Sequence, residues 1–585
     1  SILIIHIMKH IKLIIYTFLI TFAVGCSDDL LDKLPEDEIS PEAYWKTPND
    51  LALFLNQFYT SFPVHNGYNG GIFEFDNNSD NLADIFVNTR LVGNTSNVPT
   101  SDGSWSYSSI RAVNFYLENS ATAVGDAALI AHYDGEAYFF RAMFYYNLLK
   151  RYGGVPYIDK TLNTDSPELF SPRMARNELA TKIVEDLDKA IAKLKPKSSA
   201  EAFRVNQSMA FSLKSTVCLY EGTWEKYHSG TVFAAPVNES AKFLQWAADA
   251  AEALMTQGSF SLYNNGTTKT YWDLFNQINY ASNPEVMFWK KYSLADGVSH
   301  YVGHYLPHTG SGTGITKSLV DSYLDIDGLP IAVSTKYSTS QESSLTDIVK
   351  DRDPRLAQTI CTPGDLITVN SGIPNALFDF PTFRGNNEIT CTTGFQIYKG
   401  GTTDAAQRYD SWTGAIIFRY AEVLLNFAEA KAELGTLTQA DLNKSINLLR
   451  TRVGMPALSL VPVADPNKAF PALSDIINEV RRERRVELAI EGKRFDDLMR
   501  WAAADELIVG KRLLGFKIIG SGAMATEFAP EINNSILVNA QGYIDPYKNT
   551  IPTGFGFKVG RDYLSPIPSE QIILSKDNIV QNPGW

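Results

Sequence analysis

Amphipathic segments of helix length recur along most of this chain, and they restrict it to a mainly α fold. On each of them, apolar residues three and four positions apart form one buried face. The expected helices begin just after Thr47 and then cover residues 134–150, 177–193, 208–225, 240–256, 418–434, 439–453 and 473–501. Several come in pairs joined by a short turn, which is typical of tetratricopeptide-like hairpins that stack into a superhelical scaffold.

The first of these helices carries a complete start signal. Thr47 suits the N-cap position, Pro48 the first helical position and Asp50 the third. In this arrangement a hydroxyl and a carboxylate satisfy backbone N–H groups that have no partner within the helix. We therefore expect a capping box at Thr47.

Two long stretches lack helical periodicity. Residues 65–104 are rich in Asn, Asp, Gly and Ser, and residues 263–416 are dominated by Gly, Thr, Ser, Pro and Asn. Loops of this length are uncommon in compact proteins unless they are functional. The sequence thus predicts a helical scaffold with a large irregular, loop-rich region attached.

Residues 1–25 are expected to be a lipoprotein-type signal peptide that starts at Met8. Lys9 and Lys12 supply the positive charge, and the apolar run from 13 to 24 is shorter than the roughly 20 residues that a membrane-spanning helix needs.

The end of this signal, Phe22-Ala23-Val24-Gly25-Cys26, resembles a bacterial lipobox. Lipidation is therefore predicted at Cys26, with residues 26–40 as an acidic tether. Several acyl chains on one cysteine anchor a protein firmly, and we expect it at the cell surface, on the outer membrane.

Composition excludes some classes of function. The net charge of −13 argues against nucleic acid as a partner, because its phosphates are bound through Lys and Arg. Beyond Cys26, the cysteines Cys218, Cys361 and Cys391 show no CxxC or zinc-ligand spacing. A Cys361–Cys391 disulfide is left open.

Several segments together resemble the SusD/RagB family of outer-membrane nutrient-binding lipoproteins. In chain order they are Asp32-Lys33-Leu34-Pro35, Tyr44-Trp45, residues 138–142, residues 145–156, Asp351-Arg352-Asp353-Pro354-Arg355, residues 419–426, residues 446–456, residues 482–488, residues 491–498, residues 563–568 and Gln581-Asn582-Pro583-Gly584-Trp585. No single segment is specific, but the ordered set spans nearly the whole chain.

The resemblance implies the SusD-like fold, with an N-terminal helical region at 41–315 and a C-terminal region at 316–585. It also implies a surface lipoprotein that captures an oligosaccharide and passes it to a SusC-like TonB-dependent transporter. The nature of the glycan is left open, and a peptide is the alternative ligand.

Six residues are the candidate ligand contacts. Amides and carboxylates beside aromatic rings suit sugar hydroxyls and the C–H faces of sugar rings. Such residues occur in two loops, 77–90 and 299–308, which we expect to converge on one cleft. The candidates are Asn78, Asp80, Asn81, Tyr301, His304 and Tyr305.

No cofactor and no regular metal site is expected. Asp76, Asn78 and Asp80 imitate the start of an EF-hand loop, but the sixth position is Asn81 and the twelfth is Val87. An irregular calcium site is left open. His300, His304 and His308 are four apart, but Gly303 and Pro307 argue against a regular helix there.

An enzyme is the less favoured alternative. The sequence has no GxSxG, HExxH or P-loop motif. Glu479, Glu483, Glu487 and Glu491 lie four apart on one expected helix face and must be paired with cations. We therefore expect structural ion pairs there rather than catalysis by a surface glycoside hydrolase. A scaffold that contacts only proteins is a third alternative.

Overall fold

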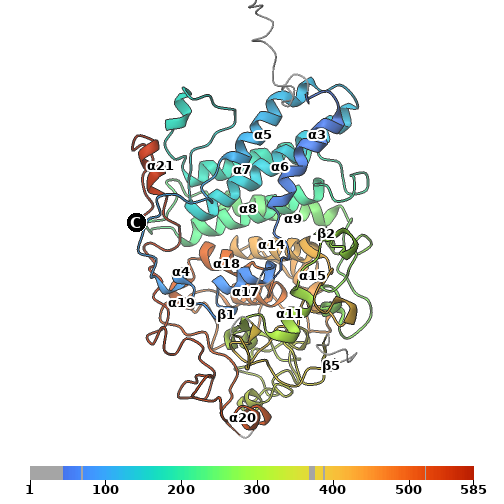
Figure 1. Cartoon of the computed structure of the whole chain (residues 1–585), viewed down its shortest axis with the longest axis vertical. Coiled ribbons are helices and arrows are strands. Elements are labelled where there is room, and N and C mark those ends of the chain that lie inside the picture. Colours follow the sequence, from blue (N-terminus) through green and yellow to red (C-terminus); the bar gives the residue numbers. More distant parts are fainter. Residues whose placement is uncertain (1–43, 68–69, 368–375, 387–388, 521) are drawn as a thin grey trace, which may run out of the picture.

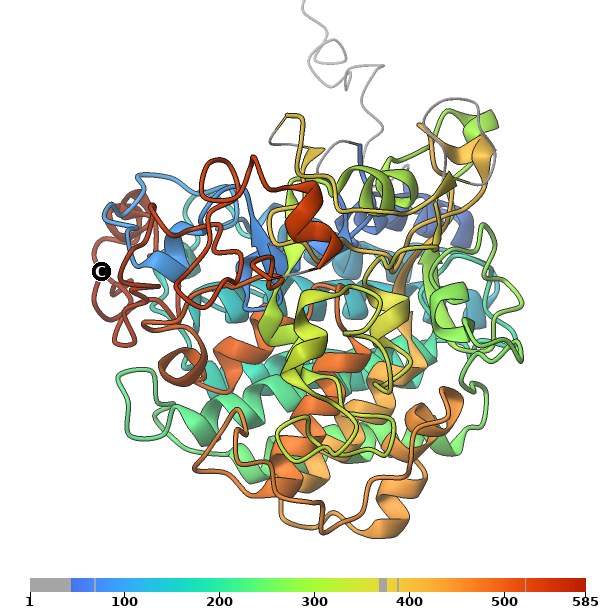
Figure 2. The ribbon, with the colours of Figure 1, turned by 90° about the horizontal axis from the view of Figure 1, so that it is seen from below.

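The computed structural model describes residues 44–585 except 68–69, 368–375, 387–388 and 521. The expected signal peptide, Cys26 and the tether at 26–40 lie outside these residues. A layer of long helices forms the upper half of the molecule in Figure 1, and a loop-rich half lies below it. Seen from below, yellow and red segments of the loop-rich half lie in front of the helices (Figure 2).

The mainly α prediction is confirmed. Neighbouring long helices pack on one another in the order α6–α7–α8–α9–α14–α17, as expected for stacked hairpins, and α5 packs on α6. The helices of this layer are α3 (Pro48–Leu55), α5 (Ser108–Asn119), α6 (Ala127–Tyr152), α7 (Arg176–Lys193), α8 (Gln207–Tyr227), α9 (Ser240–Thr256), α14 (Tyr420–Glu433) and α17 (Asp475–Glu487).

Short elements connect and extend this layer. The short helices are α4 (Thr89–Val92), α10 (Thr270–Asp273), α11 (Val302–Thr309), α12 (Lys317–Ser322), α13 (Leu356–Thr359), α15 (Gln439–Asn443), α16 (Ile446–Arg452), α18 (Arg494–Arg500), α19 (Ala504–Leu507), α20 (Ala523–Glu527) and α21 (Ser569–Leu574). Of the 3-10 helices, η2 (Asn56–Ser61) and η3 (Ile72–Asn78) matter below.

The strands form three small antiparallel pairs within the described residues. They are β1 (Leu82–Asp84) with β3 (Thr313–Ile315), β2 (Val286–Lys290) with β6 (Ala415–Arg419), and β4 (Leu366–Ile367) with β5 (Ala376–Leu377). In the first pair Leu82 faces Ile315 and Asp84 faces Thr313. The segments at 77–90 and 299–315 therefore lie beside one another, because β1 follows η3 and β3 follows α11.

Local signals account for the helix ends. The capping box at Thr47 is present, since its side chain accepts from the Asp50 N–H and the Asp50 carboxylate accepts from the Thr47 N–H. Helix α6 ends where Gly153 takes a φ of 76°, a left-handed conformation that favours glycine.

Two expected helices are each broken in two. Residues 439–453 form α15 and α16, because Ser445 leaves the helical region and its hydroxyl donates to the Asp441 carbonyl. Residues 473–501 form α17 and α18. There Ile490 has a φ of 67° and donates its N–H to the Asp76 carboxylate at 2.8 Å. Glu491 therefore lies in the loop after α17 and not on the helix, although it still shares Arg419 with Glu487.

The expectation against a helix around His304 is wrong. Residues 302–309 form α11 with Pro307 inside it. Pro307 has no N–H to donate to the carbonyl of Gly303, one turn earlier. That carbonyl instead accepts from the Thr402 N–H at 2.8 Å, so a neighbouring segment satisfies the group that proline leaves open.

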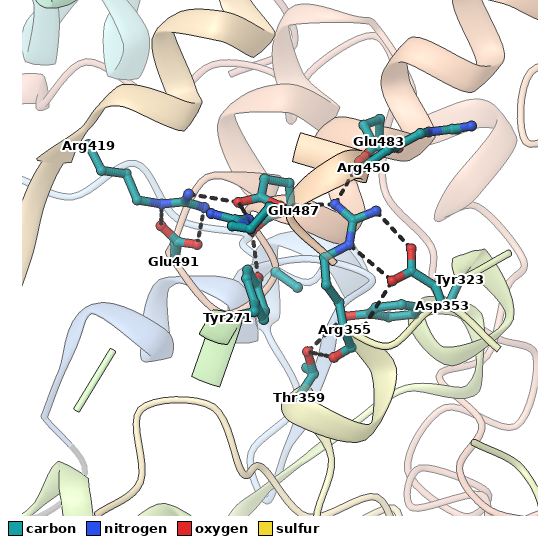
Figure 3. Close-up of polar contacts among 12 residues, drawn as sticks. Tyr271, Tyr323, Asp353, Arg355, Thr359, Arg419, Arg450, Glu483, Glu487 and Glu491 are labelled. Carbon is teal, nitrogen blue, oxygen red and sulfur yellow. Dashed lines mark hydrogen bonds and ion pairs between the residues drawn. The ribbon is translucent and has the colours of Figure 1, made fainter. Parts of the chain in front are cut away.

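The ion pairs expected for the glutamates of α17 are present and buried. The Glu487 carboxylate forms ion pairs with the guanidinium groups of Arg419 at 2.8 Å and Arg355 at 2.9 Å (Figure 3). A third ion pair joins it to Arg452 at 2.6 Å. Burial alone would raise the pKa of the Glu487 carboxyl, but these arginines, Arg452 foremost, hold it well below its ordinary value. Glu483 is bound by Arg355 at 2.6 Å and by Arg450 at 2.8 Å.

The cations come from segments far apart in the sequence. Arg355 lies in the loop-rich half, Arg419 ends β6, and Arg450 and Arg452 lie on α16. Glu491, in the loop after α17, holds both Lys399 at 2.6 Å and Arg419 at 2.7 Å. One helix and the loop after it thus join the helical layer to the loop-rich half.

Replacement of Arg355 by Met should therefore destabilise the whole molecule. The change leaves Asp353 without its guanidinium and removes one cation each from Glu483 and Glu487. Breaking a buried ion pair from one side lowers the free energy of unfolding by about 3–5 kcal/mol. Urea denaturation followed by tryptophan fluorescence measures the loss.

The matched control is Lys182→Gln, which breaks an exposed ion pair with Glu185. Its effect should stay within about 0.5 kcal/mol, as exposed pairs contribute little. If Arg355→Met cost no more than this control, the network would not hold the fold.

Candidate functional site

A buried histidine, His300, lies just before α11. The Nδ1 atom of His300 accepts from the Val302 N–H at 3.1 Å, and its Nε2–H donates to the Thr413 carbonyl at 2.8 Å. His300 is 1% exposed, and burial lowers its pKa to about 4. An uncharged imidazole with one donor and one acceptor therefore fixes the start of α11 against residues 411–413.

The loop that begins at His65 contacts the same end of α11. The Tyr292 hydroxyl donates to the His65 carbonyl at 2.7 Å and accepts from the His65 N–H at 2.8 Å. The Tyr301 N–H donates to the Asn66 carbonyl at 3.3 Å. Gly67 lies so close to the Tyr301 ring that an added Cβ would be 3.5 Å from it.

Aromatic rings gather along α11 and beside it. Tyr301 and Tyr305 lie one turn apart with ring centroids 6.3 Å from each other, and the rings of His304 and His308 stack at 4.6 Å. Tyr409 is 57% exposed and meets the ring of His304 edge-on at 5.8 Å. We call these five rings the α11 strip.

Arg408 adds a cation to the α11 strip. Its guanidinium lies 4.4 Å from the ring centroid of Tyr409. Burial, together with His308 and Arg408, lowers the pKa of His304 to about 3, and burial and Arg408 also lower the pKa of His308. Both imidazoles are therefore uncharged near neutral pH.

The α11 strip has the chemistry of a saccharide platform. Flat rings present apolar faces to the C–H side of a sugar, while phenol hydroxyls, neutral imidazoles and a guanidinium offer donors and acceptors to its hydroxyls. The segment that carries Arg408 and Tyr409 is held at both ends by Glu491, through Lys399 and Arg419. These buried ion pairs thus position the part of the strip that carries Tyr409, while His300 and Thr402 fix α11.

The structure brings together three of the six predicted contacts and separates the others. Tyr301, His304 and Tyr305 lie in or next to α11, though His304 and Tyr305 are only 3% and 9% exposed. The ligand role of all six residues stays a prediction.

The remaining three contacts lie elsewhere. Asp80, 2% exposed, is bound by Arg494 at 2.7 Å and Arg485 at 3.1 Å. Asn81 accepts from the same Arg485 at 2.9 Å. Asn78 lines a separate cavity of about 400 Å³ with Lys150 and Phe495. Asp80 and Asn81 thus join the loop-rich half to α17 and α18 rather than face solvent.

The geometry of Asp76, Asn78 and Asp80 does not suggest a cation site. The Asp76 carboxylate accepts from Ile490 and Asn81, whereas Asp80 faces two arginines. Over the described residues, no group of three or more His, Cys, Asp or Glu side chains is arranged to hold a metal ion. Cys361 and Cys391 are both buried as free thiols.

Sequence reasoning missed Arg408 and Tyr409. They stand in the run Arg408-Tyr409-Asp410-Ser411-Trp412, where aromatic and charged residues alternate within the irregular region. That composition was a usable signal. The proximity of Tyr409 to His304 could not be predicted, because about a hundred residues separate the two in the sequence.

Comparison with known protein families gives two matches on this chain. The profile described as "SusD family" matches residues 246–585, and the profile described as "Starch-binding associating with outer membrane" matches residues 29–219. Together they cover most of the helical layer and the loop-rich half.

Individual proteins agree with these matches. "SusD-like protein P2" of Formosa agariphila is 24% identical over 99% of this chain and 100% of its own length. A solved SusD-like protein from Bacteroides fragilis is 25% identical with a TM-score of 0.69, over 94% of this chain and 100% of its own. A second solved structure from that species, titled a SusD-like carbohydrate binding protein, is 21% identical with a TM-score of 0.68, over 91% and 99%.

The buried imidazoles should resist protonation. With pKa values of about 4 and about 3, His300 and His304 should stay uncharged from pH 8 down to about pH 5. The unfolded chain takes up these protons near pH 6.5, so the free energy of unfolding should fall as the pH drops below that value. Proton–carbon NMR of the imidazole rings measures both titrations. Charging of either ring between pH 6 and 7 would contradict the packing described for α11.

Proposed function

The chain belongs to the SusD family, and on that premise we propose that it is a cell-surface lipoprotein that captures oligosaccharides on the α11 strip. The proposal is carried by one observation. Exposed Tyr409 lies under the Arg408 guanidinium and meets the ring of His304, which in turn stacks on the half-buried, uncharged His308 of α11. Rigid aromatic anchors bind with little loss of conformational entropy.

Passage of the glycan to a SusC-like TonB-dependent transporter is part of the same proposal. It is supported by the family and by the description of the N-terminal match, which names association with the outer membrane. The anchor proposed is the acylated thiol of Cys26. In the part of the chain that the structure describes, no helix has the length and apolar character needed to cross a membrane.

Binding without cleavage is the activity proposed. The strip presents imidazoles held uncharged, a guanidinium and phenols. Asp76 and Asp80, whose carboxyls carry shifted pKa values, are engaged within the fold. A glycosidase needs two carboxyl groups across a cleft at about 5–9.5 Å. The side chains of the strip therefore suit the binding and release of a glycan without cleavage.

The test is a calorimetric binding screen of the protein without residues 1–26 against glycans and peptides. We expect saturable binding of one glycan class, recovered intact. Tyr409→Ala should weaken it about tenfold, equivalent to about 1.4 kcal/mol, because an exposed aromatic contact is lost.

Tyr138→Ala, on α6 and away from the strip, is the matched control and should leave affinity unchanged. Binding of peptides alone would overturn the sugar assignment. Equal affinities for Tyr409→Ala and the unaltered protein would remove the α11 strip as the site. Shortened products after long incubation would instead show hydrolysis.

A further inference from the structure

A second groove, distinct from the α11 strip, opens between the helical layer and the strands below it. Its cavity has a volume of about 570 Å³. One wall is η2, with Asn56, Tyr59 and Thr60, and the other is the end of β2 with the residue that follows it. We call it the Trp289 groove. Its size suits one or two sugar rings.

An exposed aromatic residue is held over this groove in an unusual backbone conformation. Phe203 has a φ of 60°, which a bulky side chain rarely adopts, and it is 49% exposed. Its ring lies 5.3 Å from that of Trp289, tilted by 60°. Strained residues that persist cluster at binding sites, so the strain itself suggests a function.

The residues after Phe203 explain why the strained turn persists. Arg204 binds the buried Glu136 carboxylate through two bonds, at 2.7 and 2.8 Å, and donates to the Asn56 side chain at 2.9 Å. The Val205 N–H donates to the Tyr59 hydroxyl at 2.8 Å. The turn is therefore anchored to η2 and to α6, which hold the Phe203 ring beside the groove.

Two lysines stand at the end of the groove. Lys290 and Lys291 follow Trp289 directly, and Lys291 is exposed. Within the part of the chain that the structure describes, no carboxylate forms an ion pair with either ammonium group, although the Lys290 ammonium lies over the ring of Tyr292, 5.3 Å from its centroid. Adjacent cations without counter-charges are notable in a chain whose net charge is −13. Charge complementarity therefore points to a negatively charged ligand.

We propose that the Trp289 groove binds an acidic oligosaccharide, with a sugar ring against the exposed Phe203, behind which the buried Trp289 packs, and a carboxylate or sulfate on Lys291 and Lys290. Aromatic faces supply contact with the ring, and the ammonium groups supply charge-assisted hydrogen bonds. In the Trp289 groove the two ammonium groups recognise the anionic substituent.

This site stands apart from the function proposed above. Its rings, its lysines and its walls share no residue with the α11 strip, although Lys291 precedes Tyr292, which holds the loop at His65. An acidic oligosaccharide should therefore bind the groove even when the strip is disabled.

Calorimetry on the protein without residues 1–26 tests the groove. The probes are short oligomers of galacturonate, glucuronate and mannuronate, a sulfated carrageenan tetrasaccharide, and methyl-esterified oligogalacturonate as the uncharged counterpart. We expect at least one charged probe to bind, more weakly at high salt, and its esterified or uncharged form to bind less tightly. Carboxylated and sulfated probes separate the two sources of charge.

Three variants assign the binding to these residues. Lys290→Gln with Lys291→Gln should weaken binding of the charged probe about tenfold or more. Phe203→Asn removes the ring while keeping a residue that tolerates a positive φ, and should weaken charged and uncharged probes about equally. Lys350→Gln, an exposed lysine elsewhere, is the control, and Tyr409→Ala should leave binding at the groove intact.

Thermal unfolding of each variant checks that the fold is kept. If no charged probe binds, or if the double lysine variant binds it as tightly as the unaltered protein, the groove is not an acidic-sugar site. Loss of all binding in Tyr409→Ala would also overturn the proposal of a separate site. If the α11 strip binds no glycan but charged probes still bind in the groove, the proposal of an acidic-sugar site holds.

Discussion

The buried pairing of glutamates on and just after α17 with arginines from distant segments is the interaction on which this structure depends. Glu483, Glu487 and Glu491 each hold two or three cations in the interior. A charge removed from water is costly unless opposite charges and hydrogen bonds surround it closely. Each carboxylate therefore fixes the positions of the chains that supply its partners, and the loop-rich half can have little regular structure and still be well placed.

The same network determines where ligand-binding surfaces can lie. Lys399 and Arg419 both form ion pairs with Glu491, and the segment between them carries Arg408 and Tyr409. The same segment supplies the two carbonyl groups that accept hydrogen bonds from His300. Strand β6 then runs back along β2, which ends at Trp289 and its two lysines. One segment of each proposed binding surface therefore connects to the buried charges.

Local sequence signals predicted most of the scaffold and little of its interior chemistry. Periodicity and caps located α6, α7, α8 and α9, because these helices depend on residues near one another in the sequence. The break at Ile490 depends on a hydrogen bond to Asp76, and α11 tolerates Pro307 because Thr402 donates to a distant carbonyl. Asp80 and Asn81 were predicted to contact a ligand because the sequence does not reveal that they are already paired with Arg485, which lies about 400 positions away.

The pairing of Lys399 and Arg419 with the single carboxylate of Glu491 has an evolutionary consequence. Because residues 400–418 leave and rejoin the interior at one carboxylate, their exposed positions, such as Tyr409, can change without moving the scaffold, whereas Thr402, Ser411 and Thr413 are fixed by their bonds to the residues around α11. Related chains could acquire new ligands by changing those exposed positions alone. The ancestral framework would then persist while its recognition surface diversified.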